Sequence, residues 1–362
     1  MKEWEYTFDA VSRAEWIRQI TTDLKQKPLV SLAGEWWENE ARQPVLHQED
    51  LDDEVVRLPD HLFSQAPLIM ENVAVSLIHP VEVNKYILNA LQLGVQSILF
   101  HVPSTDTIFK SEWIANVHLD WITFHVEPDN ISHESLNSFL QQMPEHAILR
   151  LVRTDSATPL ASVLSKQIQT PPIALNTLRF IYRFPSTGKW TEKTTAVFNS
   201  LLDDLHQWEA LGFDSSAFLN QCILWMEADQ DYFKQILQTR VLHLLWHNLH
   251  QHYQNVSIDP TNKYLETHIL QKENEKPEHF LIRASMSALA SSLSGTCALC
   301  IHHTYEERHP DFFQRINRNI HHLLDLESGM FKGTDPLAGA YSLDFPTKQW
   351  TTTIWESINS GK

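Results

Sequence analysis

The sequence predicts an α/β protein, a (β/α)8 TIM barrel with an N-terminal extension and a helical insertion after a mid-barrel strand. From residue 73 onwards, short apolar runs suited to buried strands alternate with helical stretches, and about eight such runs occur. Repeated β-α alternation over this length predicts a parallel sheet, and eight units close into a barrel. The 362 residues allow one large domain with an extension. We place the extension at residues 1–70 and the barrel at 71–362.

The extension differs from the rest of the chain in its periodicity. Residues 14–24 predict a short helix with Ile17, Ile20 and Leu24 on one side. Two tryptophans and an acidic turn follow without strong periodicity. The composition therefore predicts an irregular arm whose tryptophans pack on their own domain or anchor an interface.

The expected strands are short and apolar and are separated by helical stretches or turns. They cover residues 73–78, 97–102, 121–126, 147–152, 173–178, 264–270, 297–302 and 340–343. Residues 192–252 are mostly helical in pattern and too long for one crossover, so we interpret them as the insertion of extra helices.

The clearest helices are bounded by recognisable end signals. Pro80 near the first turn and Gly94 after the last one predict a helix over 80–93. A small-residue helix is expected over 283–293. An amphipathic helix is expected over 311–326, with the stripe formed by Phe312, Ile316, Ile320 and Leu324.

Charge and composition exclude several classes of function. Lys and Arg number 28 against 45 Asp and Glu, a net charge of −17, which argues against nucleic acid or an anionic membrane as a partner. No apolar run approaches the roughly 18 residues of a membrane span. Nine glycines with no G-x-G exclude the Walker and dinucleotide phosphate loops. Three cysteines form no disulfide framework, and the N-terminus has no signal-peptide pattern, so we expect a cytoplasmic protein.

Two groups of residues suggest a metal, but their spacing argues against it. Cys297 and Cys300 form a solitary C-x-x-C, and residues i and i+3 of a strand face opposite sides, so we interpret both as buried small hydrophobes. His243, His247 and His250 lie on one helix face without the glutamate of an H-E-x-x-H motif. We expect no bound metal, and we interpret the acidic pair at 203–204 as solvated surface.

Four phrases in the last third of the chain occur in a distinctive order: SGT at 294–296, RINRN at 315–319, LESG at 326–329 and DPLAGAY at 335–341. Together they resemble the end of the acyl-CoA-binding barrel of the methylmalonyl-CoA mutase family. The arm is similar to the N-terminal segment with which small subunits of that family reach across the large subunit. The cobalamin domain that commonly follows the barrel is expected to be absent.

The phrases tied to chemistry in the family are altered here. RFIYRFPSTG at 179–188 resembles the family's G-Y-H-M-Q-E-A-G and retains Tyr182 but not the histidine. ETHILQ at 266–271 resembles R-x-H-C-Q-T-S-G-W and retains His268, but Leu270 replaces the glutamine. His302 resembles the start of a strand-end phrase at the substrate channel, where a structural capping role is equally open. DLHQWE at 204–209 lacks the glycine of the cobalamin phrase D-x-H-x-x-G, and we treat it as chance.

The resemblance implies the small, non-catalytic subunit of an adenosylcobalamin-dependent methylmalonyl-CoA mutase. Its heterodimer partner, the large subunit, would bind the cofactor and convert (R)-methylmalonyl-CoA to succinyl-CoA. The acidic surface also suits poorly the unaided binding of a polyanionic CoA ester. We expect no catalytic residue and no cofactor in this chain, and Tyr182, His268 and His302 as the lining of any residual substrate site.

Two alternatives remain open. One is a stand-alone acyl-CoA-binding barrel enzyme of different chemistry, which convergent pKa-shifted acids in a pocket at the carboxyl ends of the strands would favour. The other is a metal-dependent hydrolase, suggested by the 20 histidines. A filled barrel axis would favour the subunit.

Overall fold

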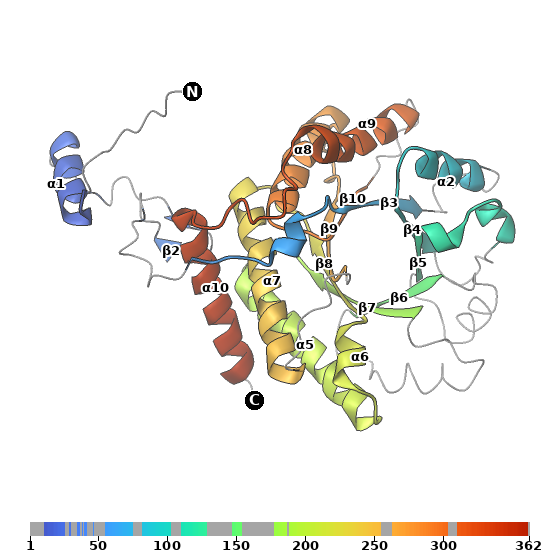
Figure 1. Ribbon diagram of the computed structural model, residues 1–362, viewed down its shortest axis with the longest axis horizontal. Helices are drawn as coiled ribbons and strands as arrows, with labels where there is room; N and C mark the ends of the chain where they lie inside the picture. Colours follow the sequence, from blue (N-terminus) through green and yellow to red (C-terminus); the bar gives the residue numbers. More distant parts are fainter. Residues whose placement is uncertain are drawn as a thin grey trace.

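A closed barrel of eight parallel strands forms the body of the protein (Figure 1). The computed structural model describes residues 11–25, 29, 35–36, 38, 40–41, 46, 55–74, 82–102, 110–128, 147–153, 177–186, 188–254, 263–302 and 310–360. The barrel strands are β3 (Leu68–Ala74), β4 (Ser97–Val102), β5 (Thr123–Pro128), β6 (Ile148–Arg153), β7 (Leu178–Phe184), β8 (Cys222–Glu227), β9 (Leu265–Ile269) and β10 (Ala298–Ile301). Each pairs with the next, and β10 pairs with β3, which confirms the predicted fold class.

Helices surround the strands on the outside of the barrel (Figure 1). They are α2 (Val83–Gln92), α5 (Trp190–Ala210), α6 (Ser215–Leu219), α7 (Tyr232–Gln254), α8 (Pro277–Leu293), α9 (Pro310–His322) and α10 (Tyr341–Ser360). Short 3-10 turns cover Asp60–Phe63, Ser111–Ile114 and Leu119–Trp121, and a π-helical turn, Leu323–Glu327, extends α9. The largest core cluster lies between α5, α7, α10 and the strands behind them, and includes the stacked rings of Trp190 and Trp350.

The N-terminal segment contains a helix, α1 (Arg13–Asp23), and a two-stranded antiparallel pair, β1 (Glu35–Trp36) and β2 (Glu40–Ala41). Ser12 and Glu15 form a capping box at the start of α1, which confirms the predicted helix. No residue of α1 is buried, and Figure 1 shows it apart from the barrel. None of the helices that the structure describes combines the length and apolar character needed to cross a bilayer.

One predicted strand is wrong, one strand was missed and two are shifted. β3 shares only residues 73–74 with the predicted 73–78, and β7 shares only residue 178 with the predicted 173–178, while residues 75–78 and 173–176 lie outside the described residues. Residues 340–343 open α10 rather than forming a strand. The eighth strand is β8, which lies inside the segment interpreted as a helical insertion. That segment is therefore two crossovers separated by a strand, with α5 and α6 before β8 and α7 after it. The burial pattern of β8, with five of its six residues buried and the last half-buried, explains the error, because a strand covered on both faces shows no alternation.

The buried face of α9 also differs from the predicted stripe. Ile320 is buried, but Phe312 is 46% exposed and Phe313 takes the inner position. The helix turns this way because Arg318 lies against the barrel, where its guanidinium donates to Glu71 of β3 from Nε at 2.6 Å. A stripe chosen for hydrophobicity alone could not include an inward-facing arginine.

Candidate functional site

The interior of the barrel is filled by an ion-paired cluster. Arg150 of β6 is fully buried. Its Nη1 and Nη2 donate to the two carboxylate oxygens of Glu266 on β9, at 2.9 and 2.8 Å, and its Nε donates to Glu127 of β5 at 2.9 Å. Two strands separate β6 from β9 around the sheet, so the Arg150–Glu266 pair crosses the inside of the barrel.

A second arginine closes the cluster on the side of the strands' carboxyl ends. Arg183, near the end of β7, donates from Nη2 to Glu127 at 2.6 Å. Its guanidinium lies 5.1 Å from the ring centroid of Trp225 on β8. The Trp225 ring in turn stacks on His268, with the centroids 4.7 Å apart. Charged and aromatic side chains therefore occupy the space that an open barrel axis would leave to a ligand.

A chain of hydrogen bonds leads from this cluster to the end of β10. Asn72 Nδ2 lies 3.2 Å from His302 Nδ1, His302 Nε2 lies 3.0 Å from His268 Nδ1, and His268 Nε2 lies 3.3 Å from Glu266 Oε2. An amide nitrogen can only donate and a carboxylate can only accept. Each imidazole is consequently neutral with its proton on Nε2, and all three bonds point towards Glu266.

Burial and pairing set the charges in the cluster. Burial opposes ionisation of Glu266, but Arg150 and His268 outweigh it and hold the pKa of Glu266 well below its usual range. Burial also opposes the charge of Arg150, and the two glutamates more than offset this, so its pKa is raised. Burial is the largest influence on His268 and lowers its pKa, in agreement with a neutral ring.

A cavity of about 660 Å³ opens where β7, β8 and β9 end against α5. Arg153, Tyr182, Arg183, Trp225 and Glu227 are among the side chains that line it. The carboxyl ends of barrel strands are where TIM-barrel active sites lie. Because the position is right and polar groups converge there, this cavity is the candidate ligand site.

The three predicted lining residues do not all meet. His268 and His302 are hydrogen-bonded neighbours. Tyr182 borders the cavity, but its side chain is fully buried and its hydroxyl donates to Asp204 of α5 at 2.8 Å. Whether any of the three binds a substrate stays a prediction.

Sequence reasoning missed the charged residues of the barrel. Asp204, interpreted as solvated surface, is fully buried and accepts from Arg153 at 2.7 Å. Asp204 is buried because Arg153, at the end of β6, points out of the barrel towards α5, and its charged guanidinium needs a carboxylate partner there. Arg150 gave one usable signal, since an arginine in the middle of an apolar strand run must find a carboxylate in the core.

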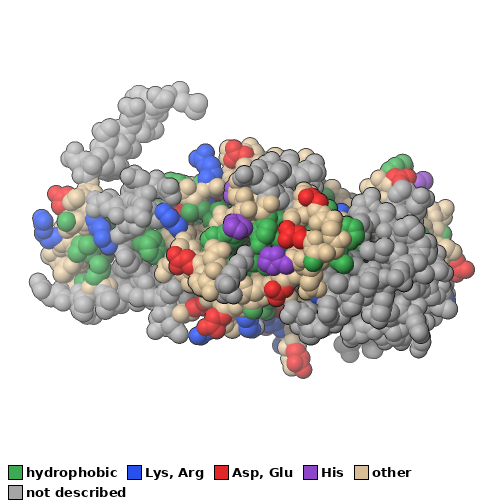
Figure 2. Space-filling model, turned by 90° about the horizontal axis from the view of Figure 1, so that it is seen from below, with side chains coloured by type: hydrophobic (Ala, Val, Ile, Leu, Met, Phe, Trp, Pro, Cys, Tyr) green, Lys and Arg blue, Asp and Glu red, His purple; other side chains and the backbone are tan. Residues whose placement is uncertain are grey.

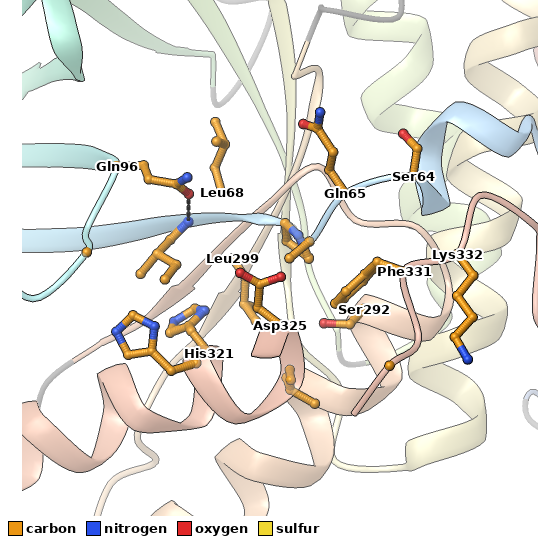
Figure 3. A pocket seen from close by; sticks show the side chains of 17 residues that line it. Ser64, Gln65, Leu68, Gln96, Ser292, Leu299, His321, Asp325, Phe331 and Lys332 are labelled. Carbon is orange, nitrogen blue, oxygen red and sulfur yellow. Dashed lines mark hydrogen bonds between the residues drawn. The ribbon is translucent and has the colours of Figure 1, made fainter. Parts of the chain in front are cut away.

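A second cavity, of about 550 Å³, lies at the opposite end of the barrel, where β3 begins (Figure 3). Figure 3 shows Gln96 beside β3, accepting from the backbone N–H of Ile69 at 3.2 Å. His321, Asp325 and Lys332 approach from α9 and the segment after it. The polar side chains of this cavity therefore lie at the other end of the barrel from the hydrogen-bonded His302 and His268.

On the face in Figure 2, the acidic and basic side chains of the described residues are scattered among uncharged and hydrophobic ones. This distribution accompanies the net charge of −17.

Residues 202–360 match the family model described as Methylmalonyl-CoA mutase. A methylmalonyl-CoA mutase of Rhizobium meliloti (strain 1021) is 26% identical over 156 residues, which cover 41% of this chain and 22% of the relative. One from Cereibacter sphaeroides is 25% identical over 155 residues, with the same coverage of each chain. The chain spans about a fifth of the length of these curated relatives. These matches support the methylmalonyl-CoA mutase family for the C-terminal part of the chain.

Solved structures give only distant likenesses. The 7,8-dihydropteroate synthase from Vibrio fischeri ES114 has a TM-score of 0.40 and 13% identity, covering 72% of this chain and 94% of that one. Active domain 2 of chitinase from Pyrococcus furiosus has a TM-score of 0.38 and 10% identity, covering 82% of this chain and 98% of that one. Likenesses at this level carry no argument about function.

Proposed function

We propose that the chain is the small, non-catalytic subunit of an adenosylcobalamin-dependent methylmalonyl-CoA mutase, paired in a heterodimer with a large catalytic chain. The match over residues 202–360 supports the family. The Arg150–Glu266 pair across the barrel carries the non-catalytic part, because an elongated acyl-CoA needs an open interior in order to enter the barrel. The conversion of (R)-methylmalonyl-CoA to succinyl-CoA would take place on the partner.

The cofactor would also belong to the partner. The nearest approach to a cobalamin phrase is Asp204 to Glu209, which lies within α5. Asp204 already accepts hydrogen bonds from Arg153 and Tyr182, and His206 is on the exposed side of the helix. These residues do not fit a loop that presents a histidine to a corrin, so no step of the reaction is assigned to this chain.

The role of residues 1–70 as an arm on the large chain is part of the same proposal. The lack of fully buried residues in α1 supports it, because Trp16, Ile17 and Ile20 on its apolar side are only half-buried in the part of the chain that the structure describes. Deletion of residues 1–25 should then weaken co-purification with the large chain and leave the thermal unfolding of the barrel unchanged. The proposal places the heterodimer in the cytoplasm.

A second candidate is a stand-alone acyl-CoA-binding barrel enzyme of different chemistry. The cavity at the carboxyl ends of the strands favours it, since Arg183 and Glu227 border a space large enough for an acyl group and part of a pantetheine arm. The cavity would bind such a ligand outside the barrel axis rather than within it.

The test is mutase turnover with adenosylcobalamin and methylmalonyl-CoA. It compares this chain alone, the large chain alone and the two co-expressed. The proposal expects no turnover by this chain alone, together with co-purification and turnover of the pair. Turnover by this chain alone would refute the non-catalytic role, and failure to associate would refute the subunit.

A further inference from the structure

We infer that His268, Cys300 and His302 form a binding site for a transition-metal cation, for which Zn²⁺ is the best match. One ligand atom from each of the three side chains lies within 4.8 Å of the others. Among the described residues, this is the one group of three histidine, cysteine or acidic side chains whose ligand atoms lie close enough to share an ion. The inference concerns this chain alone and does not depend on the subunit proposal.

The strand register brings the three residues together. Cys300 of β10 lies directly beside His268 of β9 in the parallel ladder. His302 follows Cys300 by two residues and therefore lies on the same face. This face points into the barrel near the carboxyl ends of the strands, where the active sites of TIM barrels lie. Cys297 and Cys300 were interpreted from the sequence as buried small hydrophobes, and the closeness of Cys300 to two histidines was not predicted.

The two imidazoles are spaced as ligands of one ion. His268 Nδ1 and His302 Nε2 are 3.0 Å apart. Two nitrogens bound to one tetrahedral Zn²⁺ at about 2.0–2.1 Å are separated by roughly 3.3 Å. The observed distance is a few tenths of an ångström shorter than this, and a turn of the two rings that points both nitrogens at a common centre would admit the ion. Closure of Cys300 onto it completes a Cys-His₂ set.

The other nitrogen of each ring already has a partner. His268 Nε2 faces Glu266, which Arg150 clamps from the opposite side. His302 Nδ1 faces Asn72, whose amide oxygen would accept a hydrogen bond from a protonated Nδ1 after the amide group turns over. Carboxylate and amide partners that orient ligating histidines are the usual outer support of a metal site. Trp225 stacked on His268 further restricts the ring.

The chemistry balances without another reactant. The cation takes the place of the proton that His302 Nε2 shares with His268 Nδ1. That proton moves to His302 Nδ1, so both imidazoles stay neutral. The Cys300 thiol loses its proton to solvent and becomes a thiolate ligand. Burial raises the pKa of the free Cys300 thiol, and the charge of the ion offsets that cost. Three protein ligands leave a fourth position for water or an anionic ligand.

The test uses the full-length protein, stripped with a chelator and titrated with Co²⁺ as a spectroscopic probe for Zn²⁺. The inference expects one equivalent of Co²⁺, a thiolate-to-cobalt charge-transfer band in the near ultraviolet, and loss of the band when Zn²⁺ is added. Cys300→Ser should remove the band. Cys297→Ser is the matched control, because Cys297 is also buried and lies three residues away, and it should keep the band.

A second variant guards against misfolding of Cys300→Ser. His302→Gln alters a half-buried residue just after β10, and it should weaken Co²⁺ binding by at least about tenfold while far-ultraviolet circular dichroism stays unchanged. Absence of stoichiometric Co²⁺ binding would overturn the inference. So would a charge-transfer band that survives in Cys300→Ser.

Discussion

Arg150 and Glu266 share two hydrogen bonds, at 2.9 and 2.8 Å, across the inside of a barrel from strands that are not neighbours. Both side chains are buried. The pair makes the barrel axis part of the core at the level of β6 and β9.

Arg150→Met should destabilise the fold strongly. The change leaves the Glu266 carboxylate buried without its guanidinium, whereas Glu127 keeps Arg183. We expect a loss of about 3–5 kcal/mol in the free energy of unfolding, measured by urea titration. Lys189→Met is the control, since Lys189 pairs with Glu192 at the surface and its removal should have no measurable effect. Equal effects of the two substitutions would contradict a structural role for the axis cluster.

Asp335→Asn should also be costly. Asp335, the first residue of the DPLAGAY phrase, accepts from Arg240 Nη1 at 2.9 Å and from the backbone N–H of Leu58 at 3.0 Å. It thereby ties α7 and the segment before β3 to the chain that leads into α10. We expect a loss of about 3 kcal/mol, seen as a lower Tm. Asp325→Asn is the control, because it changes an exposed acid ten residues earlier in the chain. A Tm lowered as much by Asp325→Asn would contradict the structural role of Asp335.

Gly295→Ala should cost more than Gly212→Ala. Both glycines have a positive φ, 89° and 86°, so both substitutions carry a backbone cost of about 1 kcal/mol. A Cβ at Gly295 would lie 3.3 Å from Phe63 and 3.4 Å from His243, whereas a Cβ at Gly212 would meet nothing within 4 Å. The difference between the two variants in the free energy of unfolding, measured by urea titration, gives the cost of the contacts at Gly295. An equal loss in both variants would show that these contacts relax freely.

Stability should fall in mild acid through His243. Its Nδ1 lies 2.6 Å from the Tyr264 hydroxyl and its Nε2 lies 3.0 Å from the Gly295 carbonyl. Burial lowers the pKa of His243 to about 3, against about 6.5 in an unfolded chain. Between these values the unfolded state binds the extra proton, so the free energy of unfolding drops as pH falls, by up to about 1.4 kcal/mol per pH unit.

His243→Gln tests this origin of the acid sensitivity. Free energies of unfolding measured from pH 7.5 to pH 4.5 should show a slope smaller by about one proton in the variant. Above pH 7.5 the two proteins should differ only by a constant amount. Parallel curves at all pH values would assign the acid loss to other groups.

Local patterns predicted much of the barrel but not its contents. β4 agrees with the predicted 97–102, and Gly94 ends α2 in the left-handed conformation that its position suggested. β8 was missed because its burial on both faces removes the alternation that marks a strand. The pairing of Arg150 with Glu266, and the closeness of Cys300 to two histidines, depend on the register and closure of strands far apart in sequence. No spacing within one segment carries that information.

The central claim is that the filled axis leaves this chain without acyl-CoA binding of its own. Isothermal titration of methylmalonyl-CoA into the isolated chain, and into its complex with the large chain, tests it most directly. The account predicts no saturable binding to the chain alone and one site per heterodimer. Stoichiometric binding to the chain alone would contradict it.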